Sequence, residues 1–368
     1  MPLCWLDLRG SGLSVLERLL LEECLLRHEQ ESDGQPLRNW IVVGHHEPTR
    51  HRYLQVPIPR SANPHHNPSA VIVMGIGGKP KELLDLDLVK GEQVMTLKRF
   101  TGGGTVVLDH DSIYTTIIGR RPVMDKDRQE TSETNERLYP NVEAFPRPIM
   151  QWSVDAIFGP LFDGLQSEQV RKSGAEDPPS TVKKGITVPA AGGGTKQTLV
   201  MDTKSCGMDN SGEVISIPVT QLDESNKSLC EGGSGEPERF ALRENDYVLG
   251  ERKMGGNAQS IVKSGWLHHT SFLWDFQPEH MDYLTLPSKR PDYRKDRSHH
   301  DFLVTLQRSY PNLQKNDFYA ILKQVCEDAF DLETITIRQA MDVVNRKGGM
   351  QAWFEKGGRT RIVDHNSF

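Results

Sequence analysis

The chain has 368 residues, of which 36% are hydrophobic and 26% are charged, and it is long enough to bury a sizeable core. Its 44 Lys and Arg against 50 Asp and Glu leave a net charge of -6, which argues against nucleic-acid binding, since a phosphate backbone attracts basic surfaces. No run of about 18 apolar residues predicts a membrane span, and the five Cys form no Cys-x-x-Cys pair, which excludes a disulfide framework and a structural zinc site.

The N-terminal segment predicts a strand followed by a helix. Residues 2–8 have the composition of a strand, and Leu13 to Leu26 form an amphipathic pattern that is typical of a helix with one solvated face. The charged positions of this helix are Glu17, Arg18, Glu22 and Glu23. No basic segment precedes an apolar run, so a secretory signal is not expected. We expect a cytoplasmic protein, and a mitochondrial one only if a targeting segment lies upstream.

Two polar segments separate the next predicted elements. Residues 46–68 lie between strand-like runs at 40–43 and 70–74, and residues 124–139 are charged without a hydrophobic period. Five His fall between positions 45 and 66. Because they lack fixed ligand spacing, we interpret them as part of a solvated loop rather than a metal site.

A long stretch without aromatic residues divides the chain. Phe162 and Phe240 are separated by 77 residues that contain no Phe, Tyr or Trp. Its Gly, Pro, Ser and charged residues cannot offset the entropy of ordering. We therefore expect a mostly disordered insertion at 166–238, with a short strand from Gly212 as its one exception. The main domain then comprises 1–165 and 239–310, followed by a helical extension at 311–368.

The remaining pattern is mixed. Strands are predicted near 245–249 and 268–274, and helices near 299–309, 317–329 and 337–345. This combination indicates an α/β (α+β) fold, in which a mixed sheet is flanked by helices.

Three glycine-rich segments are candidates for phosphate binding. The first, Met74 to Pro80, lacks the first Gly and the Ser or Thr of a Walker A loop, because Val73 and Pro80 occupy those positions. The third, Ala191 to Lys196, has no flanking strand and is interpreted as a linker.

The second glycine-rich segment runs from Lys98 to Asp109. Gly102, Gly103 and Gly104 follow an apolar strand, and three glycines let a backbone approach a ligand closely with N–H groups that point at an anion. Arg99 just before them adds a charged contact. A tight hairpin turn without a ligand fits the pattern equally well.

A lysine segment follows in the second half. The strand Tyr247 to Leu249 turns at Gly250 and returns through Lys253, and small residues follow from Gly255 to Ala258. A Lys on a hairpin is usually a solvated charge, but the glycines after it indicate that another group packs closely there.

Together these segments resemble the lipoate–protein ligase family, within the biotin/lipoate ligase and octanoyltransferase superfamily. Three motifs carry the resemblance: Lys98 to Val106, Asn245-Asp246 with Lys253-Met-Gly-Gly-Asn-Ala, and His268-His-Thr-Ser-Phe-Leu. The resemblance covers about 1–163 and 238–310, and the lysine segment looks closest to a eukaryotic branch.

The resemblance implies a mixed sheet flanked by helices and an activity. A medium-chain acid, lipoate or octanoate, would react with ATP and Mg²⁺ to give an acyl-adenylate. The acyl group would then pass to a lysine of a carrier, either a lipoyl domain of a 2-oxoacid dehydrogenase complex or the glycine cleavage H protein.

The resemblance also implies roles for individual residues. Lys253 would contact the acyl carbonyl and the adenylate phosphate, stabilising charge that develops during transfer. Asn245 and Asp246 would organise ATP, with Asp246 holding Mg²⁺. The other residues expected to bind substrate or nucleotide are Arg99, Gly102, Gly103, Gly104, Thr105, Gly255, Gly256, Asn257, Ala258 and His269.

The sequence departs from the family pattern in three ways. Leu108 occupies a position where family ligases often carry His, and no Cys lies near Lys253, which argues against a cysteine nucleophile. Residues 311–368 are short for the accessory domain of bacterial ligases, so a lipoyltransferase that uses a preformed acyl-adenylate is a second form of the hypothesis. The alternatives are a biotin–protein ligase-like enzyme and a non-catalytic acyl- or nucleotide-binding module.

A basic segment at 289–297 includes Lys295 and Arg297 and is interrupted by acidic residues. It is interpreted as a solvated loop or as a docking face for an acidic carrier domain.

Overall fold

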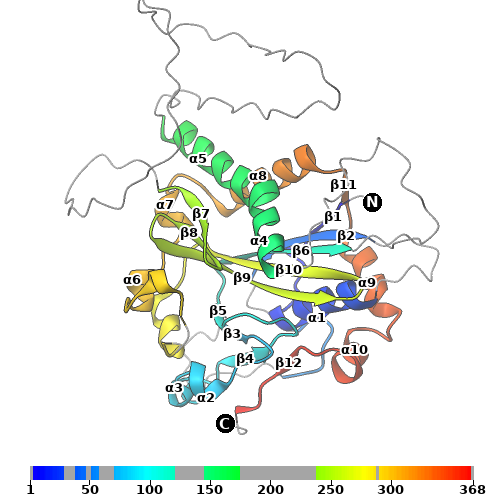
Figure 1. The fold of residues 1–368 in the computed structure, drawn as a ribbon. Coiled ribbons are helices and arrows are strands. Elements are labelled where there is room, and N and C mark those ends of the chain that lie inside the picture. Colours follow the sequence, from blue (N-terminus) through cyan, green and yellow to red (C-terminus); the bar gives the residue numbers. More distant parts are fainter. Residues whose placement is uncertain are drawn as a thin grey trace, which may run out of the picture. The chain divides into compact units, whose positions relative to one another are not determined.

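Two mixed β-sheets organise the computed structural model (Figure 1). The structure describes residues 3–28, 38–46, 51–57, 70–120, 145–174, 238–286 and 290–365, which belong to one compact unit. The charged run at 124–139, the third glycine segment and the strand expected from Gly212 lie outside the described residues, as does most of the polar loop at 46–68.

The larger sheet has eight strands in the order β11-β1-β2-β6-β10-β9-β8-β7. Its first three strands are parallel, and every later pair is antiparallel. The strands are β1 (Leu3–Asp7), β2 (Asn39–His45), β6 (Ser112–Arg120), β7 (Phe240–Arg243), β8 (Asp246–Leu249), β9 (Arg252–Val262), β10 (Gly265–Leu273) and β11 (Leu332–Thr334). The mixed sheet expected from the sequence is confirmed.

The smaller sheet has four strands in the order β12-β4-β3-β5. Only β3 and β4 are parallel. The strands are β3 (Val71–Met74), β4 (Met95–Lys98), β5 (Val106–Leu108) and β12 (Arg361–Ile362). The glycine segment at 102–104 connects β4 to β5, so this sheet carries it.

Helices cover both faces of the larger sheet (Figure 1). Phe158, Phe162 and Phe318 pack on one face, and the leucines of the first helix pack on the other. The α-helices are α1 (Val15–His28), α2 (Pro80–Leu83), α3 (Leu86–Gly91), α4 (Pro146–Ser153), α5 (Gly159–Ser173), α6 (His299–Phe302), α7 (Leu306–Ser309), α8 (Lys315–Ala329), α9 (Ile337–Asn345) and α10 (Met350–Lys356). A π-helical turn, η2 (Val154–Phe158), joins α4 to α5, and two 3₁₀ turns are η3 (Pro278–Tyr283) and η4 (Asp292–Arg294). In the described part of the chain, no helix is long and apolar enough to cross a membrane.

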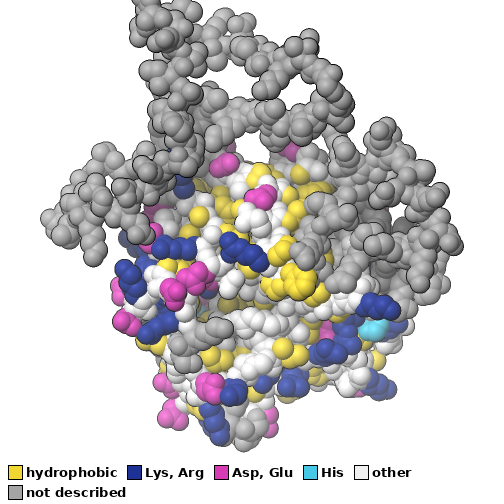
Figure 2. Space-filling model, viewed as in Figure 1, with side chains coloured by type: hydrophobic (Ala, Val, Ile, Leu, Met, Phe, Trp, Pro, Cys, Tyr) yellow, Lys and Arg dark blue, Asp and Glu magenta, His cyan; other side chains and the backbone are white. Residues whose placement is uncertain are grey.

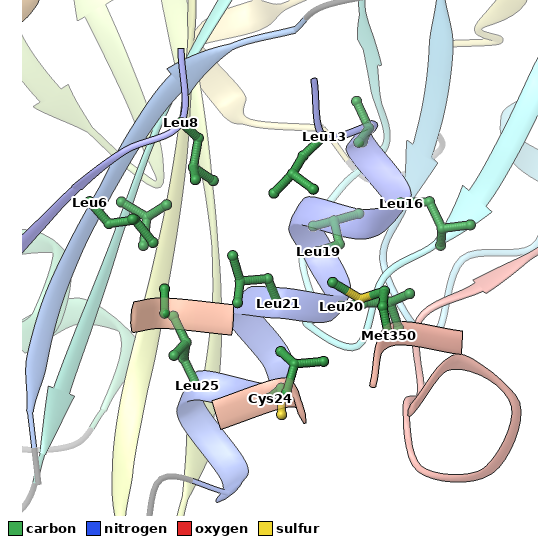
Figure 3. Packing of buried hydrophobic residues seen from close by; sticks show 14 of the residues in the cluster. Leu6, Leu8, Leu13, Leu16, Leu19, Leu20, Leu21, Cys24, Leu25 and Met350 are labelled. Atoms are coloured by element: carbon green, nitrogen blue, oxygen red, sulfur yellow. The ribbon is translucent and has the colours of Figure 1, made fainter. Parts of the chain in front are cut away.

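Helix α1 lies in the core rather than at its surface. Its leucines pack against the sheet and against Met350 of α10 (Figure 3). The helix expected at this position is present, but the expectation that its charged face is solvated is wrong. Glu17, Glu22 and Glu23 are completely buried, and Arg18 is nearly so. The larger sheet covers Glu22, residues 53 and 54 cover Glu17, and residues 359 and 360 cover Glu23, so the charges are compensated by hydrogen bonds instead of water.

Each buried carboxylate of α1 has its own partners. Glu17 accepts from Ser14 and from backbone N–H groups at 53 and 54. Glu23 Oε2 accepts from the N–H of Arg359, at 3.0 Å, and from the N–H of Thr360, at 3.1 Å. Burial without such bonds would cost several kcal/mol per charge, so these contacts fix α1 in the core.

The described C-terminal residues are part of both sheets. Helices at 315–329 and 337–345 are present as expected, but β11 extends the larger sheet beside β1, and β12 pairs with β4. This region is therefore not a separate helical extension. The boundary expected at residue 165 falls inside α5, which continues to Ser173, because Phe162 and Leu165 bury its apolar side on the core.

Candidate functional site

The triple-glycine loop packs directly onto β9. The N–H of Gly102 donates to the carbonyl of Gln259 at 3.3 Å. Gly103 has φ +88, and a Cβ there would lie 3.0 Å from Ala258 Cβ and 3.3 Å from the carbonyl oxygen of Asn257. A Cβ on Gly75 would lie 2.3 Å from the carbonyl oxygen of Gly103. The first and second glycine segments and the lysine strand therefore meet at one place, where Gly103 and Gly104 are exposed.

Arg99 holds this loop from beneath. Its Nη2 donates to the carbonyls of Gly102 and Gly104 at 2.7 and 2.8 Å, its Nε donates to Thr101 Oγ1 at 2.7 Å, and its Nη1 donates to the carbonyl of Val73 at 3.1 Å. The side chain is 5% exposed, and burial, together with the charge of Arg18, lowers its pKa to about 10. The sequence led us to expect a direct contact between Arg99 and a phosphate or acyl head group. In the structure the guanidinium instead faces the carbonyls of the loop.

Lys253 on β9 forms an ion pair with Asp246 on β8. Its Nζ lies 2.7 Å from Asp246 Oδ1, and Tyr293 Oη donates to Asp246 Oδ2 at 2.9 Å. A register shift in the β8–β9 ladder places Lys253 opposite Val248, while Asp246 faces Gly256. A Cβ on Gly256 would lie 3.5 Å from Lys253 Nζ. The bulge and the missing side chain at Gly256 thus allow the ammonium group to reach the carboxylate.

The Asn245-Asp246 pair is tied to β9 by a second contact. Asn257 Nδ2 donates to the carbonyl of Asn245 at 2.7 Å. Gly255 is buried, and a Cβ there would meet the ring of Phe272 and the carbonyl of Ser271 at 2.9 Å. The glycine at this position follows from close packing beneath the strand.

His269 faces α1. Its Nε2 lies 2.7 Å from Glu22 Oε2, and Thr116 Oγ1 donates to Glu22 Oε1 at 2.9 Å. Burial by itself would raise the pKa of Glu22, but the charge of Arg18 and the bond from His269 outweigh it and lower the pKa. Burial lowers the pKa of His269, and its Nε2 donates to the Glu22 carboxylate. The ring contacts Phe100 edge-on, with centroids 5.7 Å apart.

Two other expected positions have different surroundings. The buried Oγ1 of Thr105 has no hydrogen-bond partner among the described residues. Asp109, which follows Leu108, lies 3.2 Å from His280 Nδ1. Burial would raise the pKa of Asp109, but hydrogen bonds from His280 and from two backbone N–H groups lower it overall. Asp109 is therefore a buried structural carboxylate.

The residues around Asp246 could bind Mg²⁺ only if substrate phosphates supplied further ligands to the ion. Mg²⁺ commonly uses one or two carboxylates and completes its shell with phosphates and water. No cluster of three His, Cys, Asp or Glu residues with the spacing of a metal site occurs in the described ranges. Asp246 is the one expected metal ligand, and both its oxygens already accept from Lys253 and Tyr293. A donor set of this kind suits a cation that arrives with a nucleotide.

The segment at 290–297 is a folded turn rather than a solvated loop. Arg297 donates to the carbonyls of Tyr293, Arg294 and Glu251, so its guanidinium fastens the turn. Lys295 is exposed and has φ 56. On the face shown in Figure 2, Lys and Arg side chains lie among Asp and Glu side chains along the side that α6 occupies in Figure 1. Arg297 therefore has a structural role that the docking interpretation did not include.

Several residues of this region escaped the sequence analysis. Tyr293 contacts Asp246 from 47 positions away and Glu22 contacts His269 from 247 positions away, whereas Gln259 contacts Asn257. Gln259 directly follows the quoted motif, and its position was the only local signal. The others lie on distant elements, and a single sequence carries no information on those pairings.

A glycine loop of the smaller sheet, packed on the lysine hairpin of a larger mixed sheet that helices flank, defines a ligase-type catalytic domain. The chain matches the family model described as the lipoyl protein ligase A/B catalytic domain over residues 64–143 and 222–327. These ranges include about half of the chain, and the protein belongs to this family.

The individual relatives have low sequence identity to this chain. A protein of Plasmodium falciparum (isolate 3D7) named "Inactive lipoate--protein ligase 2" is 23% identical over 310 residues, which are 81% of this chain and 62% of the relative. The chain thus spans less than two thirds of that relative's length. A lipoate-protein ligase A bound with ATP is 13% identical with a TM-score of 0.47, over 94% of this chain and 93% of that one. A bipartite lipoate protein ligase with its E2 lipoyl domain from Thermoplasma acidophilum is 12% identical with a TM-score of 0.47, over 94% and 92%.

Proposed function

We propose that this protein attaches a medium-chain acyl group, lipoyl or octanoyl, to a lysine of a carrier domain by way of an acyl-adenylate. The observation that carries the proposal is the Lys253–Asp246 pair at 2.7 Å, set beside the glycine loop. A positioned ammonium group and exposed backbone N–H groups are suited to stabilising negative charge on a phosphate and on a carbonyl oxygen in the transition state.

The chain's own residues divide the task. Lys253 would move from Asp246 to the acyl carbonyl and adenylate phosphate, and Gly103 and Gly104 would offer N–H groups to the same anion. Asp246, with Tyr293 donating to its other oxygen, would be left to hold a phosphate-bound Mg²⁺, which supplies charge neutralisation when bound. Arg99 would keep the loop in shape through its bonds to the carbonyls of Gly102 and Gly104.

The acyl donor and the acceptor belong to the proposal as well. The protein either forms the acyl-adenylate from octanoate or lipoate with ATP, or receives a preformed acyl-adenylate. The carrier would be a lipoyl domain of a 2-oxoacid dehydrogenase complex or the glycine cleavage H protein. A cytoplasmic or mitochondrial location remains a prediction.

One assay tests these points together. The full chain is incubated with octanoate, ATP, Mg²⁺ and a lipoyl domain, and in parallel with octanoyl-adenylate and the same domain. We expect the intact mass of the lipoyl domain to rise by one octanoyl group. Product only with the preformed adenylate identifies a transferase, product in both arms identifies a ligase, and no product on any carrier in either arm contradicts the proposal.

A non-catalytic acyl- or nucleotide-binding module is the second candidate. It is favoured by the name of the Plasmodium falciparum relative, which contains the word inactive. It is also favoured by the hydrogen bonds that Arg99 donates to backbone carbonyls. Calorimetry with octanoyl-adenylate separates the two functions, because tight binding without carrier acylation supports the module.

A further inference from the structure

A series of hydrogen-bonded polar side chains, half-buried at one end and completely buried at the other, runs beneath the candidate site. It begins at Asn257 and ends at Ser153, the last residue of α4. Gln259 Nε2 lies 2.8 Å from Asn257 Oδ1 and 2.9 Å from His268 Nδ1. His268 Nε2 lies 2.9 Å from Tyr247 Oη, which is 3.2 Å from Ser153 Oγ. None of these contacts follows from the motifs that identified the family.

The hydrogen-bond donors and acceptors of these linked side chains can be arranged in only one direction. Asn257 Nδ2 donates to the carbonyl of Asn245, so its Oδ1 accepts from Gln259. The same Gln259 nitrogen has a second hydrogen, and its neighbour His268 Nδ1 must accept it, because both nitrogens cannot donate to each other. The proton of the neutral imidazole therefore sits on Nε2 and is donated to Tyr247 Oη.

The far end of the series agrees with this direction. Ser153 Oγ donates to the carbonyl of Met150 at 2.7 Å, so it accepts from Tyr247 Oη at 3.2 Å or from His268 Nε2 at 3.4 Å, and either contact agrees with a proton on Nε2. His268, Tyr247 and Ser153 are all completely buried, so bulk solvent does not reach their polar atoms. The π-helical turn η2 begins at the next residue, Val154, and single π-turns occur frequently at functional sites.

We propose that His268 and Gln259 are positioning residues, which fix the side-chain amide of Asn257 so that it holds the Asn245-Asp246 turn against β9. A rotated amide would present its oxygen to the carbonyl of Asn245 and repel it. Asp246 would then lose its fixed place beside Lys253, although neither His268 nor Gln259 touches the reacting groups. The catalytic part of this inference rests on the proposed function, whereas the proton arrangement does not.

The first experiment measures the proton arrangement in the full chain. The ¹⁵N chemical shifts of histidine rings distinguish a protonated ring nitrogen from an unprotonated one, and loss of one signal pair in His268→Asn assigns His268. We expect a proton on Nε2 and none on Nδ1 at pH 7. A proton on Nδ1 would contradict this hydrogen-bond arrangement, whether or not the protein acylates a carrier.

The second experiment separates positioning from plain structural support. His268→Leu and Gln259→Leu remove the connection, whereas His268→Asn can restore an acceptor oxygen near the place of Nδ1. We expect both Leu variants to lower kcat/KM for octanoyl-adenylate about tenfold, in line with a lost buried hydrogen bond, with the carrier KM unchanged. His268→Asn should recover most of the loss.

A matched control lies in the same sheet. Thr115 is completely buried on β6, and its Oγ1 has no hydrogen-bond partner among the described residues. Thr115→Val should leave kcat/KM unchanged. If the kinetic losses of all variants merely follow their thermal unfolding midpoints, with no recovery in His268→Asn, the positioning role is wrong. If wild type yields no product, the proposed function fails by itself, and the affinity of each variant for octanoyl-adenylate, measured by calorimetry, decides the inference.

Discussion

At the scale of single residues, Lys253 is the side chain on which the proposed chemistry depends most. Lys253→Ala should lower carrier acylation about 10²-fold or more, the range found when a group that stabilises transition-state charge is removed. Stability should change by less than about 1 kcal/mol, because the pair is partly exposed and such pairs contribute little. Intact-mass kinetics and urea unfolding measure the two effects.

The neighbouring Arg252 provides the control for this substitution. Its Nη2 lies 3.4 Å from Glu238 Oε1 on the surface. Arg252→Ala should leave acylation unchanged, and equal losses in the two variants would show that the assay reports on the charge of β9 rather than on Lys253.

His268 gives the protein a measurable acid sensitivity. Burial, and secondly the charge of His269, lowers its pKa to about 3, whereas an unfolded imidazole titrates near 6.5. Below about pH 6.5 the unfolded chain therefore binds a proton that the folded chain does not, so stability falls as the pH drops towards 3 and is regained above 6.5.

This pH effect can be isolated by comparing two proteins. Between pH 6 and 5 the free energy of unfolding of wild type should fall more steeply than that of His268→Asn, by up to about 1.4 kcal/mol per pH unit. Urea titrations at each pH measure both slopes. Parallel slopes would mean that His268 takes up a proton in the folded state as readily as in the unfolded one.

The local motifs name residues that the fold brings onto or beside β9, but they do not say how every side chain points. Lys253 and Asp246 lie together because β8 pairs with β9, and the glycine loop packs on the same strand β9 at Ala258. Arg99 was assigned to a ligand and instead binds carbonyls of its own loop. Its orientation depends partly on the carbonyl of Val73, 26 positions earlier in the chain, which a local motif does not place next to it.

At the scale of elements, the glycine loop depends on one backbone conformation. Gly103 has φ +88, and a Cβ would lie 2.8 Å from Arg99 Nη2. Gly103→Ala should destabilise the fold by about 1–2 kcal/mol, the cost of a left-handed residue with a side chain, and should lower acylation because the loop shifts from β9. Thermal unfolding and acylation rates measure the two consequences.

The adjacent Gly102 is the matched comparison. A Cβ there meets nothing within 4 Å, and its φ lies outside the positive range. Gly102→Ala should leave the free energy of unfolding within about 0.5 kcal/mol of wild type, as is usual for surface substitutions away from special features. A loss as large as that of Gly103→Ala would contradict the conformational argument.

The elements with a strong local pattern were predictable, and the others were not. The helix at 337–345 and the hairpin through Lys253 match the expectation. The strands β11 and β12, with three and two residues, are too short for a periodic signal, and pairing with β1 and β4 decides them. The helices from Pro146 to Ser173 were missed because the aromatic-free stretch drew the boundary at residue 165.

At the scale of the whole molecule, Glu23 joins the first helix to the last strand. Its carboxylate accepts from Arg27 and from the backbone of Arg359 and Thr360. Glu23→Gln should lower the free energy of unfolding by about 3 kcal/mol, because the amide N–H groups would face other donors in a buried site. Hydrogen exchange at 357–365 should accelerate more than exchange in β10.

An exposed glutamate on β11 serves as the control. Glu333→Gln changes the same charge at an exposed position and should leave both quantities unchanged. Equal protection of 357–365 in wild type and Glu23→Gln would contradict the anchoring role.

The long separation between Glu23 and Thr360 also bears on the order of events during synthesis. When α1 leaves the ribosome, the N–H groups that compensate Glu23 have not yet been made, and more than 300 residues must still be translated. Docking the helix earlier would bury an uncompensated charge. We therefore expect the nascent N-terminal half to stay open, and to require chaperone protection of its leucines, until the final strand emerges.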